Sequence, residues 1–302
     1  MVDLRRTGRL IALALVAWSG RARAQACCAG SSAVTPGRLG LHDVALVGVE
    51  ARAATLVGSF DASGAYRARA PGTLEDDLEQ DLFASYRVFR HAQVALLVPF
   101  VETARRAGNA SDAGGGIGDV NLSARYDFFQ AGRSRWLPGV ALLAGVTFPS
   151  GRPVGPDTGP LAAGATGVGA FQLNGGLALE QAWGPWLVSL YGLVAARTPF
   201  ELAGVSETLA PQVSALASVG YVTAREIAVA LSASVTYEGN PVVDGATVPD
   251  TEKITSSLAL GAVLPIGDHW RAQLAMTWNP PVLGQNAIAA AGFTWTLVRT
   301  WY

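Results

Sequence analysis

The stretch Arg225–Glu238, REIAVALSASVTYE, decides the fold class of this chain of 302 residues. Ile227 and every second residue after it as far as Tyr237 are apolar, and the residues between them are small or polar. Successive side chains of a β-strand point to opposite faces, so this strand would have one apolar wall and one polar wall. A transmembrane barrel requires this pattern, because its outer face meets lipid and its inner face meets water or packed polar groups.

Segments with the same two-residue period recur along the chain, and their connections are alternately short and long. We predict about twelve strands, an even number as in bacterial single-chain barrels. They span Val44–Phe60, Asp76–Val88, Gln93–Thr103, Gly115–Phe128, Leu137–Phe148, Gly167–Ala182, Trp186–Phe200, Glu207–Val222, Arg225–Glu238, Thr251–Pro265, Trp270–Asn279 and Gln285–Trp301. The sequence therefore predicts an all-β, antiparallel up-and-down transmembrane barrel. A soluble β-sandwich is the alternative, but its strands are usually only about five or six residues long.

The placement of the connections and of the aromatic residues orients this barrel. Short turns belong on the periplasmic side and long loops outside, so both termini should lie in the periplasm of a Gram-negative bacterium. Aromatic side chains should form a girdle at each membrane interface. Near the short turns these are Phe89, Phe128, Phe129, Trp136, Trp183, Trp186, Tyr221, Trp270 and Trp301, and near the long loops Phe60, Phe100, Phe148, Phe200, Tyr237 and Trp278.

The first residues are typical of a secretory signal peptide. Arg5, Arg6 and Arg9 precede the apolar run Leu10–Trp18, which is far shorter than the roughly 20 residues of a spanning helix. Ala22-Arg23-Ala24 supplies a small-x-small cleavage site. We predict a signal peptide over residues 1–24, a periplasmic segment over 25–43 that is long enough to enter the lumen as a plug, and a barrel over 44–302.

Two adjacent cysteines, Cys27 and Cys28, follow the cleavage site. They fit an oxidisable periplasmic tail, a lipid-attachment site or part of a metal site, although two thiolates do not complete a tetrahedral site. The net charge of −1 gives no basic footprint for nucleic acid. The expected partners are therefore outer-membrane lipid, the barrel-assembly machinery and an unidentified small solute, and no cofactor is expected.

The segment Gly114–Phe129, GGGIGDVNLSARYDFF, and the following Leu137–Pro153, LPGVALLAGVTFPSGRP, resemble one family. They are similar to outer-membrane proteins of the meta-pathway phenol-degradation family, which combine a glycine-rich loop and Gly-Asp-Val with a strand that ends in Phe-Pro-Ser/Thr-Gly. The resemblance covers the central third of the chain and implies a barrel that passes small, often aromatic, molecules. The C-terminus departs from the usual alternating barrel ending, because Arg299 breaks the apolar row that leads to Trp301.

Assigning the apolar row of each strand to lipid leaves the other row for the lumen. The candidate lumen-facing residues are Glu79, Asp81, Arg87, Asp119, Asn121, Arg125, Gln172, Asn174, Glu180, Arg197, Arg271 and Gln273. Their opposite charges would either fill a narrow barrel as ion pairs or set up a transverse field that orients polar solutes. We expect Asp81, Asp119, Arg125 and Arg271 to approach one another, because unpaired charges are costly where water is restricted.

About twelve strands enclose more space than the eight that side chains just fill, and less than the 16–18 of open porins. We therefore expect a narrow or partly plugged channel that passes small solutes passively, including hydrophobic or aromatic ones. A structural or surface-interaction barrel with a closed lumen is the alternative.

An enzyme is less expected, because barrel hydrolases usually need a histidine base near a Ser or Asp. His91 and His269 fall in predicted periplasmic turns, and His42 precedes the first strand. An acidic run could attract Ca²⁺, but a solvated loop end is the favoured interpretation: Glu75, Asp76, Asp77, Glu79 and Asp81.

Overall fold

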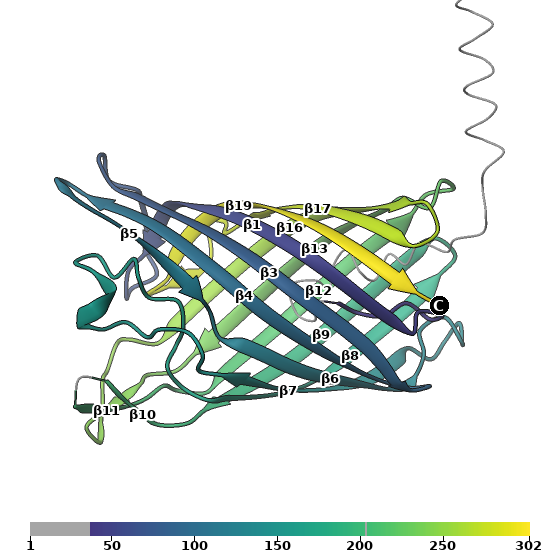
Figure 1. The fold of residues 1–302 in the computed structure, drawn as a ribbon, viewed down its shortest axis with the longest axis horizontal. Coiled ribbons are helices and arrows are strands. Elements are labelled where there is room, and N and C mark those ends of the chain that lie inside the picture. Colours follow the sequence, from purple (N-terminus) through teal and green to yellow (C-terminus); the bar gives the residue numbers. More distant parts are fainter. Residues whose placement is uncertain (1–36, 203) are drawn as a thin grey trace, which may run out of the picture.

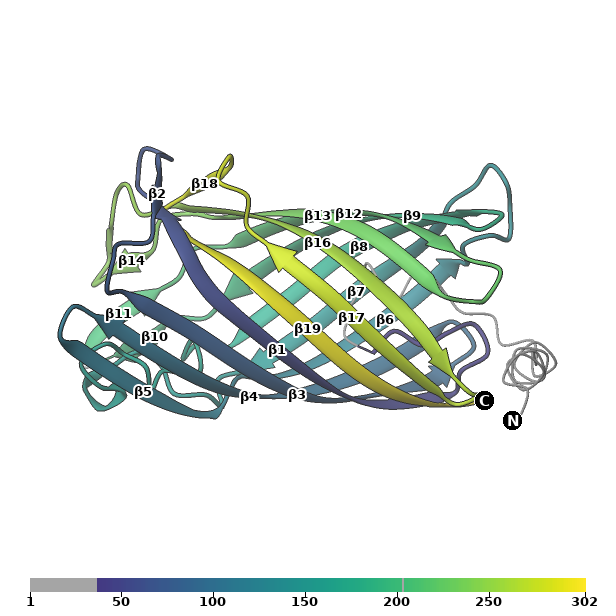
Figure 2. The ribbon, with the colours of Figure 1, turned by 90° about the horizontal axis from the view of Figure 1, so that it is seen from above.

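The computed structural model describes residues 37–202 and 204–302. The predicted signal peptide, Cys27 and Cys28 lie outside the described residues. Twelve antiparallel strands form a ring that the pairing of β13 with β16 closes. Figures 1 and 2 show the tilted strands of this barrel from two directions. The predicted all-β barrel of about twelve strands is confirmed.

The strands of the ring match the predicted segments to within a few residues at most ends. They are β1 (Ala45–Phe60), β3 (Leu74–Phe89), β4 (Ala92–Ala107), β6 (Val120–Phe129), β7 (Gly139–Phe148), β8 (Gln172–Trp183), β9 (Trp186–Arg197), β12 (Gln212–Val222), β13 (Ala228–Glu238), β16 (Lys253–Ile266), β17 (Trp270–Trp278) and β19 (Ile288–Trp301). Within the described residues, no helix has the length and apolar character needed to cross a membrane.

The two faces of each strand differ in burial, as the alternation of residue types requires. On β13, Val229, Leu231 and Tyr237 are exposed on the outside of the barrel. Ala228 and Ala230, on the other row, are buried. Exposure of so many apolar side chains to water would be unfavourable in free energy. The outer wall is therefore suited to contact with lipid.

The connections differ between the two ends of the barrel. At one end, which we call the short-turn end, β3 and β4 are separated by residues 90–91, and β8 and β9 by residues 184–185. The C-terminus lies at this end, on the right of Figure 1. The opposite end, the long-loop end, carries residues 61–73, 149–171, 198–211 and 239–252 between successive ring strands. Short and long connections therefore alternate as predicted.

Parts of the predicted loops are themselves strands. The predicted loop 104–114 is mostly a hairpin, because β4 continues to Ala107 and β5 (Ala110–Ile117) pairs with it. Near the same end, β2 (Tyr66–Ala68) pairs with β1, and β18 (Gly284–Gln285) pairs with β16. A separate four-stranded sheet joins two loops: β10 (Phe200–Leu202), β11 (Val205–Thr208), β14 (Val242–Val243) and β15 (Ala246–Thr247).

The aromatic residues predicted near the short turns are all exposed. The outward-facing Arg299, which interrupts the apolar row, lies over two of these rings, with its Cζ 5.7 Å from the centre of Trp270 and 5.1 Å from that of Trp301. A cation above an indole face is stabilised by the ring quadrupole, so this position tolerates arginine. Phe60 was wrongly assigned to the outer girdle: it is buried, and its ring packs edge-on against Tyr66.

Candidate functional site: the lumen wall

The inner wall of the barrel is the candidate functional site. With the exception of Asp119, the candidate residues lie on ring strands and are buried or half-buried. Glu79, Asp81 and Arg87 lie on β3, and Asn121 and Arg125 on β6. The remaining strands contribute Gln172, Asn174 and Glu180 on β8, Arg197 on β9, and Arg271 and Gln273 on β17.

A buried group of charges lies near the short-turn end. Glu180 accepts hydrogen bonds from Arg125 Nη2 at 3.0 Å, from Arg38 Nη1 at 2.6 Å and from the Tyr191 hydroxyl at 2.7 Å. Arg125 Nη2 also lies 2.8 Å from Asp127 Oδ1. The side chains of Glu180 and Arg125 are only 2% and 4% exposed. We call these five residues the Glu180 cluster; its two cations and two anions balance.

Residues 37–43, which precede β1, lie against the inner wall at the same end. Leu39 is buried among apolar side chains of the wall, namely Leu46, Phe83 and Val298. Asp43 Oδ2 is 3.1 Å from Arg271 Nη2, and Arg87 Nε donates to the Asp43 carbonyl oxygen at 2.8 Å. Both ionic and apolar contacts therefore fix this segment to the wall.

A second group of charges lies near the middle of β1 and β3. Arg52 Nη2 is 3.3 Å from Glu50 Oε1 and 3.5 Å from Asp81 Oδ2, and Arg52 Nη1 is 3.4 Å from Glu79 Oε2. The Thr296 hydroxyl donates to Glu50 at 2.9 Å. The Asp81 side chain is 2% exposed, yet its Oδ1 accepts no hydrogen bond from the described residues. We call Glu50, Arg52, Glu79 and Asp81 the Arg52 cluster; three carboxylates share one guanidinium.

A cavity of about 220 Å³ lies beside the wall formed by β6 to β9 and β12. Its lining combines amides, hydroxyls and leucines, including Asn121, Leu143, Thr147, Asn174, Leu193 and Ser214. Asn121 Nδ2 donates to Thr147 Oγ1 at 2.9 Å, and Gln172 Nε2 donates to Asn174 Oδ1 at 2.7 Å. Hydrogen bonds between these side chains hold the polar groups in place, and Arg197 Nε also donates to Gln172 Oε1 at 2.8 Å.

The two sequence motifs that carry the family resemblance bind each other at the long-loop end. Asp119 lies in a break between β5 and β6, not on a ring strand as predicted. It accepts hydrogen bonds from Gly151 N at 2.9 Å and from Val168 N at 2.7 Å. Ser150 Oγ donates to the Gly118 carbonyl oxygen at 2.8 Å. The Gly-Asp-Val and Phe-Pro-Ser-Gly motifs thus form a junction that anchors loop 149–171.

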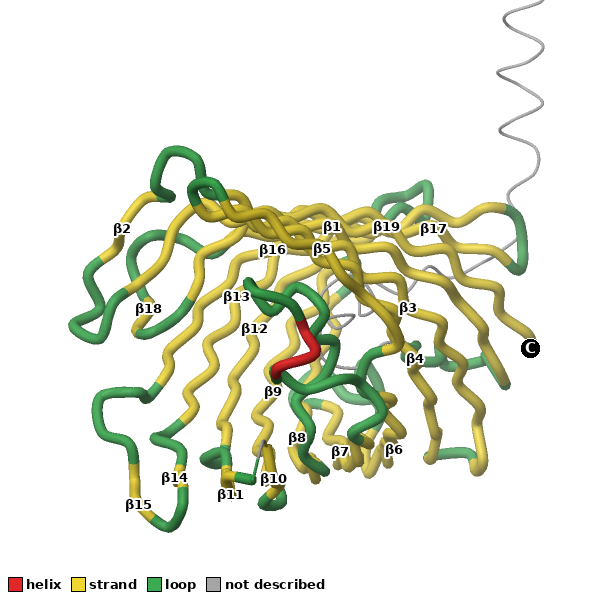
Figure 3. Tube along the Cα trace, turned by 60° about the vertical axis from the view of Figure 1, so that its left-hand side comes forward, coloured by secondary structure: helices red, strands yellow, loops and turns green. Residues whose placement is uncertain are grey.

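Loop 149–171 is also held by the β4–β5 hairpin. Arg105 Nη1 donates to the Leu161 carbonyl oxygen at 2.9 Å, and Asp112 Oδ2 accepts from Leu161 N at 3.0 Å. The loop contains the short 3-10 helix η1 (Pro156–Thr158), red in Figure 3, which lies in front of the ring strands when the long-loop end comes forward. Loop 149–171 is therefore anchored at the long-loop end.

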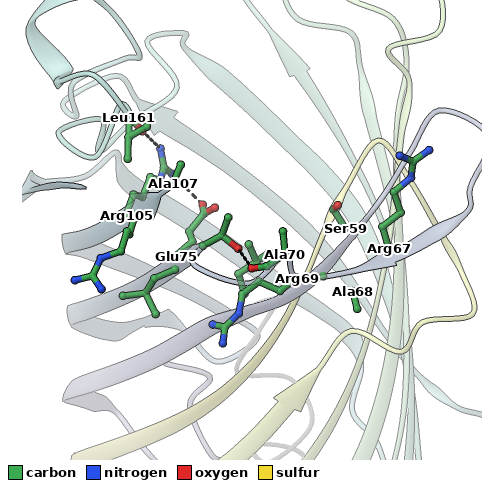
Figure 4. Close-up of a pocket in the computed structure, with 14 residues that line it drawn as sticks. Ser59, Arg67, Ala68, Arg69, Ala70, Glu75, Arg105, Ala107 and Leu161 are labelled. Carbon is green, nitrogen blue, oxygen red and sulfur yellow. Dashed lines mark hydrogen bonds and ion pairs between the residues drawn. The ribbon is translucent and has the colours of Figure 1, made fainter. Parts of the chain in front are cut away.

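A larger cavity of about 590 Å³ lies beside that loop, where β1 and β4 end and β3 begins. Figure 4 shows its lining residues, with Arg69, Glu75, Arg105 and Leu161 among those labelled. Leu56 and Thr73 also line the cavity. Arg105 Nη2 is 3.1 Å from Glu75 Oε1 and thus joins the cavity wall to the loop contact. The lining combines apolar residues with charged ones, and the cavity lies at the long-loop end.

The predicted meeting of Asp81, Asp119, Arg125 and Arg271 is wrong. Asp81 shares Arg52 with two other carboxylates, Arg125 binds Glu180, and Arg271 binds Asp43. Asp119 binds loop backbone instead of a cation. The prediction failed because residue alternation shows only that a side chain faces the lumen. It does not show how high in the barrel that side chain lies or which strands are its neighbours, since the strands are tilted.

Several residues of these clusters were missed by the sequence reasoning. Glu50 and Arg52 occupy the inward row of β1, where the alternation that was applied to other strands would have found them. Tyr191 was missed because the sequence reasoning counted aromatic residues as apolar and so assigned none of them to the polar row. Arg38 precedes the first strand, where no periodicity assigns it a face.

The described residues contain no group of three or more His, Cys, Asp and Glu side chains able to hold a metal ion. The acidic run is not a loop end, because β3 begins at Leu74 and all of these residues lie on it. Glu75, Asp77, Glu79 and Asp81 share the inward row, and Asp76 is on the outward row. His91 and His269 lie in turns of the short-turn end, and His42 precedes β1.

Comparison with known proteins gives a fold relationship. No family model and no curated protein sequence matches the chain. The structure is similar to that of an outer membrane channel from Pseudomonas putida, with a TM-score of 0.73 and 15% sequence identity over 88% of this chain and 97% of that one. The NanC porin and the CymD monoaromatic hydrocarbon channel have TM-scores of 0.49 and 0.41, at 9% and 10% identity. They cover 84% and 86% of this chain and 100% and 89% of their own, and they are too distant to carry an argument.

At this identity the Pseudomonas channel establishes architecture and not activity. The barrel fold implied by the motifs around Asp119 and Ser150 agrees with it. The chain has the fold of a twelve-stranded outer membrane channel.

Proposed function

We propose that this protein is an outer-membrane channel for the passive passage of small solutes, including hydrophobic or aromatic ones. The observation that carries the proposal is the 220 Å³ cavity in the lumen wall, with its amides beside Leu143 and Leu193. An apolar cavity of about 150 Å³ accommodates a benzene ring. The cavity is therefore large enough for one aromatic ring that carries a hydrogen-bonding substituent.

The cavity at the long-loop end supplies the entrance in this proposal. Its apolar residues Leu56 and Leu161 suit a ring, and its mouth is open to the medium. A solute would enter there, pass loop 149–171 and meet the amide-lined wall. We place the long-loop end outside the cell and both termini in the periplasm, with outer-membrane lipid around the apolar wall and assembly by the barrel-assembly machinery.

The test is conductance and uptake by the purified mature protein. Planar-bilayer recordings should show discrete openings, and liposomes that contain the protein should take up a small aromatic probe such as phenol faster than empty liposomes. Silence in the bilayer together with no uptake would refute the proposal.

A barrel with a closed lumen is the second candidate function, and the contacts of residues 37–43 favour it. In this case the segment acts as a plug, held by Arg38 on Glu180 and by Leu39 among apolar side chains. Arg38→Ala and deletion of residues 25–43 loosen it in two ways. A lumen that the segment closes is silent in the unmodified protein and gains conductance in both variants. A channel that the segment only narrows conducts already and gains further, and a barrel that is silent in all three forms has a lumen closed by its wall. Arg133→Ala, at an exposed site in the β6–β7 turn, is the matched control.

A further inference from the structure

The charges inside the barrel are matched in most places. Contacts of 2.7 to 3.1 Å join the following pairs: Arg197 with Glu238, Arg105 with Glu75, and Arg271 with Asp43. The Glu180 cluster is balanced as well, with two cations and two anions. Pairs of this kind contribute no net charge to the field that a passing ion experiences.

Two places are exceptions. Arg87, near the short-turn end, binds backbone carbonyl oxygens of the described residues, and the Arg52 cluster, near the middle of β1 and β3, has an excess of acidic groups. Three carboxylates lie within 3.5 Å of one guanidinium, so the acidic groups outnumber the cation. Asp77, on the same inward row of β3, is bound by the neutral Thr103 hydroxyl at 2.8 Å and adds to the excess. Independently, the buried Asp81 Oδ1 has no hydrogen-bond donor among the described residues. A buried carboxylate oxygen without a donor is costly, so the site favours any positive charge that approaches it.

The wall made by β12 and β13 offers no compensating charge. Neither Gln212–Val222 nor Ala228–Glu238 contains a basic residue. Their half-buried inward side chains are mainly small and hydroxylated: Ser214, Ser218, Ser232, Ser234 and Thr236. Small neutral residues leave room for a permeating solute, and they do not offset the acidic excess of Asp77 and the Arg52 cluster.

We propose that the lumen selects for cations, with Glu50, Glu79 and Asp81 as the selectivity group, and that the preferred solutes carry a positive charge. The inference rests on the proposed channel function and adds the charge class of the permeant. Rings of acidic side chains produce cation preference in pores because they raise the local concentration of cations and repel anions.

The test is the reversal potential of the full mature protein in a planar bilayer under a KCl gradient. The expected result is a permeability ratio of K⁺ to Cl⁻ that exceeds one several-fold and falls as ionic strength rises. Screening shortens the reach of the cluster from about 10 Å at 0.1 M salt to about 3 Å at 1 M. Glu79→Gln should lower the ratio, and the triple variant Glu50→Gln, Glu79→Gln, Asp81→Asn should bring it close to one.

Glu102→Gln is the matched control, because Glu102 lies on the outward row of β4 and is exposed. It should leave the ratio unchanged. Heat-modifiable gel migration verifies that each variant has formed a folded barrel. If the triple variant fails this check, the permeability ratio of Glu79→Gln alone tests the inference. A conducting protein with no cation preference, or with a preference that Glu79→Gln and Glu102→Gln alter equally, would overturn the inference and leave the channel proposal standing. Absence of any current would overturn the inference, and absence of current together with no uptake by liposomes would overturn the channel proposal as well.

Discussion

The Glu180 cluster and the Arg52 cluster are two groups of ionisable side chains in one lumen, and they differ in how completely their charges are matched. Around Glu180, two arginines and a tyrosine hydroxyl satisfy one buried carboxylate. Around Arg52, three carboxylates share one cation, and a buried oxygen of Asp81 has no donor among the described residues. A matched buried network supports the fold, whereas an unmatched one costs stability and is retained where function needs its charge.

The largest expected effect is on the matched cluster. Glu180→Gln would leave Arg38 and Arg125 with Asp127 as their only acidic partner in the cluster. Removal of one member of a buried ion pair typically costs about 3–5 kcal/mol. We expect a loss of this size in the free energy of unfolding, measured by urea titration of the barrel in lipid vesicles with tryptophan fluorescence. A loss below about 1 kcal/mol, within the range of an exposed ion pair, would show that the two clusters do not differ in this way.

Tyr191→Phe sharpens the comparison by removing one hydrogen bond to Glu180 while both arginines stay in place. Hydrogen bonds to charged groups contribute about 1.5–3 kcal/mol. The same urea titration should show a loss in that range. Tyr221→Phe, on the outward face of β12, is the control and should be close to neutral; an equal loss in both variants would contradict the role of Tyr191.

Asp119 provides a reference away from both clusters, because its carboxylate binds backbone N–H groups instead of a cation. Asp119→Ala would leave Gly151 N and Val168 N without their acceptor, at a cost of about 1–3 kcal/mol. The loss should be local and should release loop 149–171. We expect faster chymotryptic cleavage after Leu161, whereas Asp157→Ala, an exposed change in the same loop, should not accelerate it. Equal cleavage rates would rule out the junction as the anchor.

The smallest expected effect lies in the exposed loop after β1. Hydrogen bonds from the Ser63 hydroxyl and the Ala65 backbone N–H lower the pKa of Asp61 from 3.8 to about 2. Because this pKa is lowered, the ionised carboxylate orders the loop fully at pH values above its ordinary pKa of 3.8. It loses this contribution as the pH falls through about 2. The ¹³C shift of the Asp61 carboxyl group should report this midpoint, and Ser63→Ala should raise it. A midpoint near 3.8 in the unmodified protein would show that these bonds do not form in solution.

The sequence predicted the ring strands well, because residue alternation reports which face meets lipid. β13 shows this clearly, since its apolar row is exposed and its small-residue row is buried. The contacts inside the lumen could not be predicted from residue alternation. Arg125 on β6 meets Glu180 on β8, with β7 between them, and this contact depends on strand register and tilt. The prediction that Asp119 faces the lumen from a ring strand failed for a local reason: Asp119 lies in a break between β5 and β6 and binds a loop.

The most direct test of the contrast between the two clusters is the free energy of unfolding of Glu79→Gln beside that of Glu180→Gln. Each variant removes one negative charge from the lumen and preserves side-chain volume. Because Glu79 is 31% exposed and shares its cation with two other carboxylates, its loss should change stability by no more than about 0.5 kcal/mol, or should stabilise the barrel by relieving repulsion. Glu180→Gln should cost several kcal/mol more. Equal losses in the two variants, or a larger loss for Glu79→Gln, would contradict the assignment of the Glu180 cluster to folding and of the Arg52 cluster to permeation.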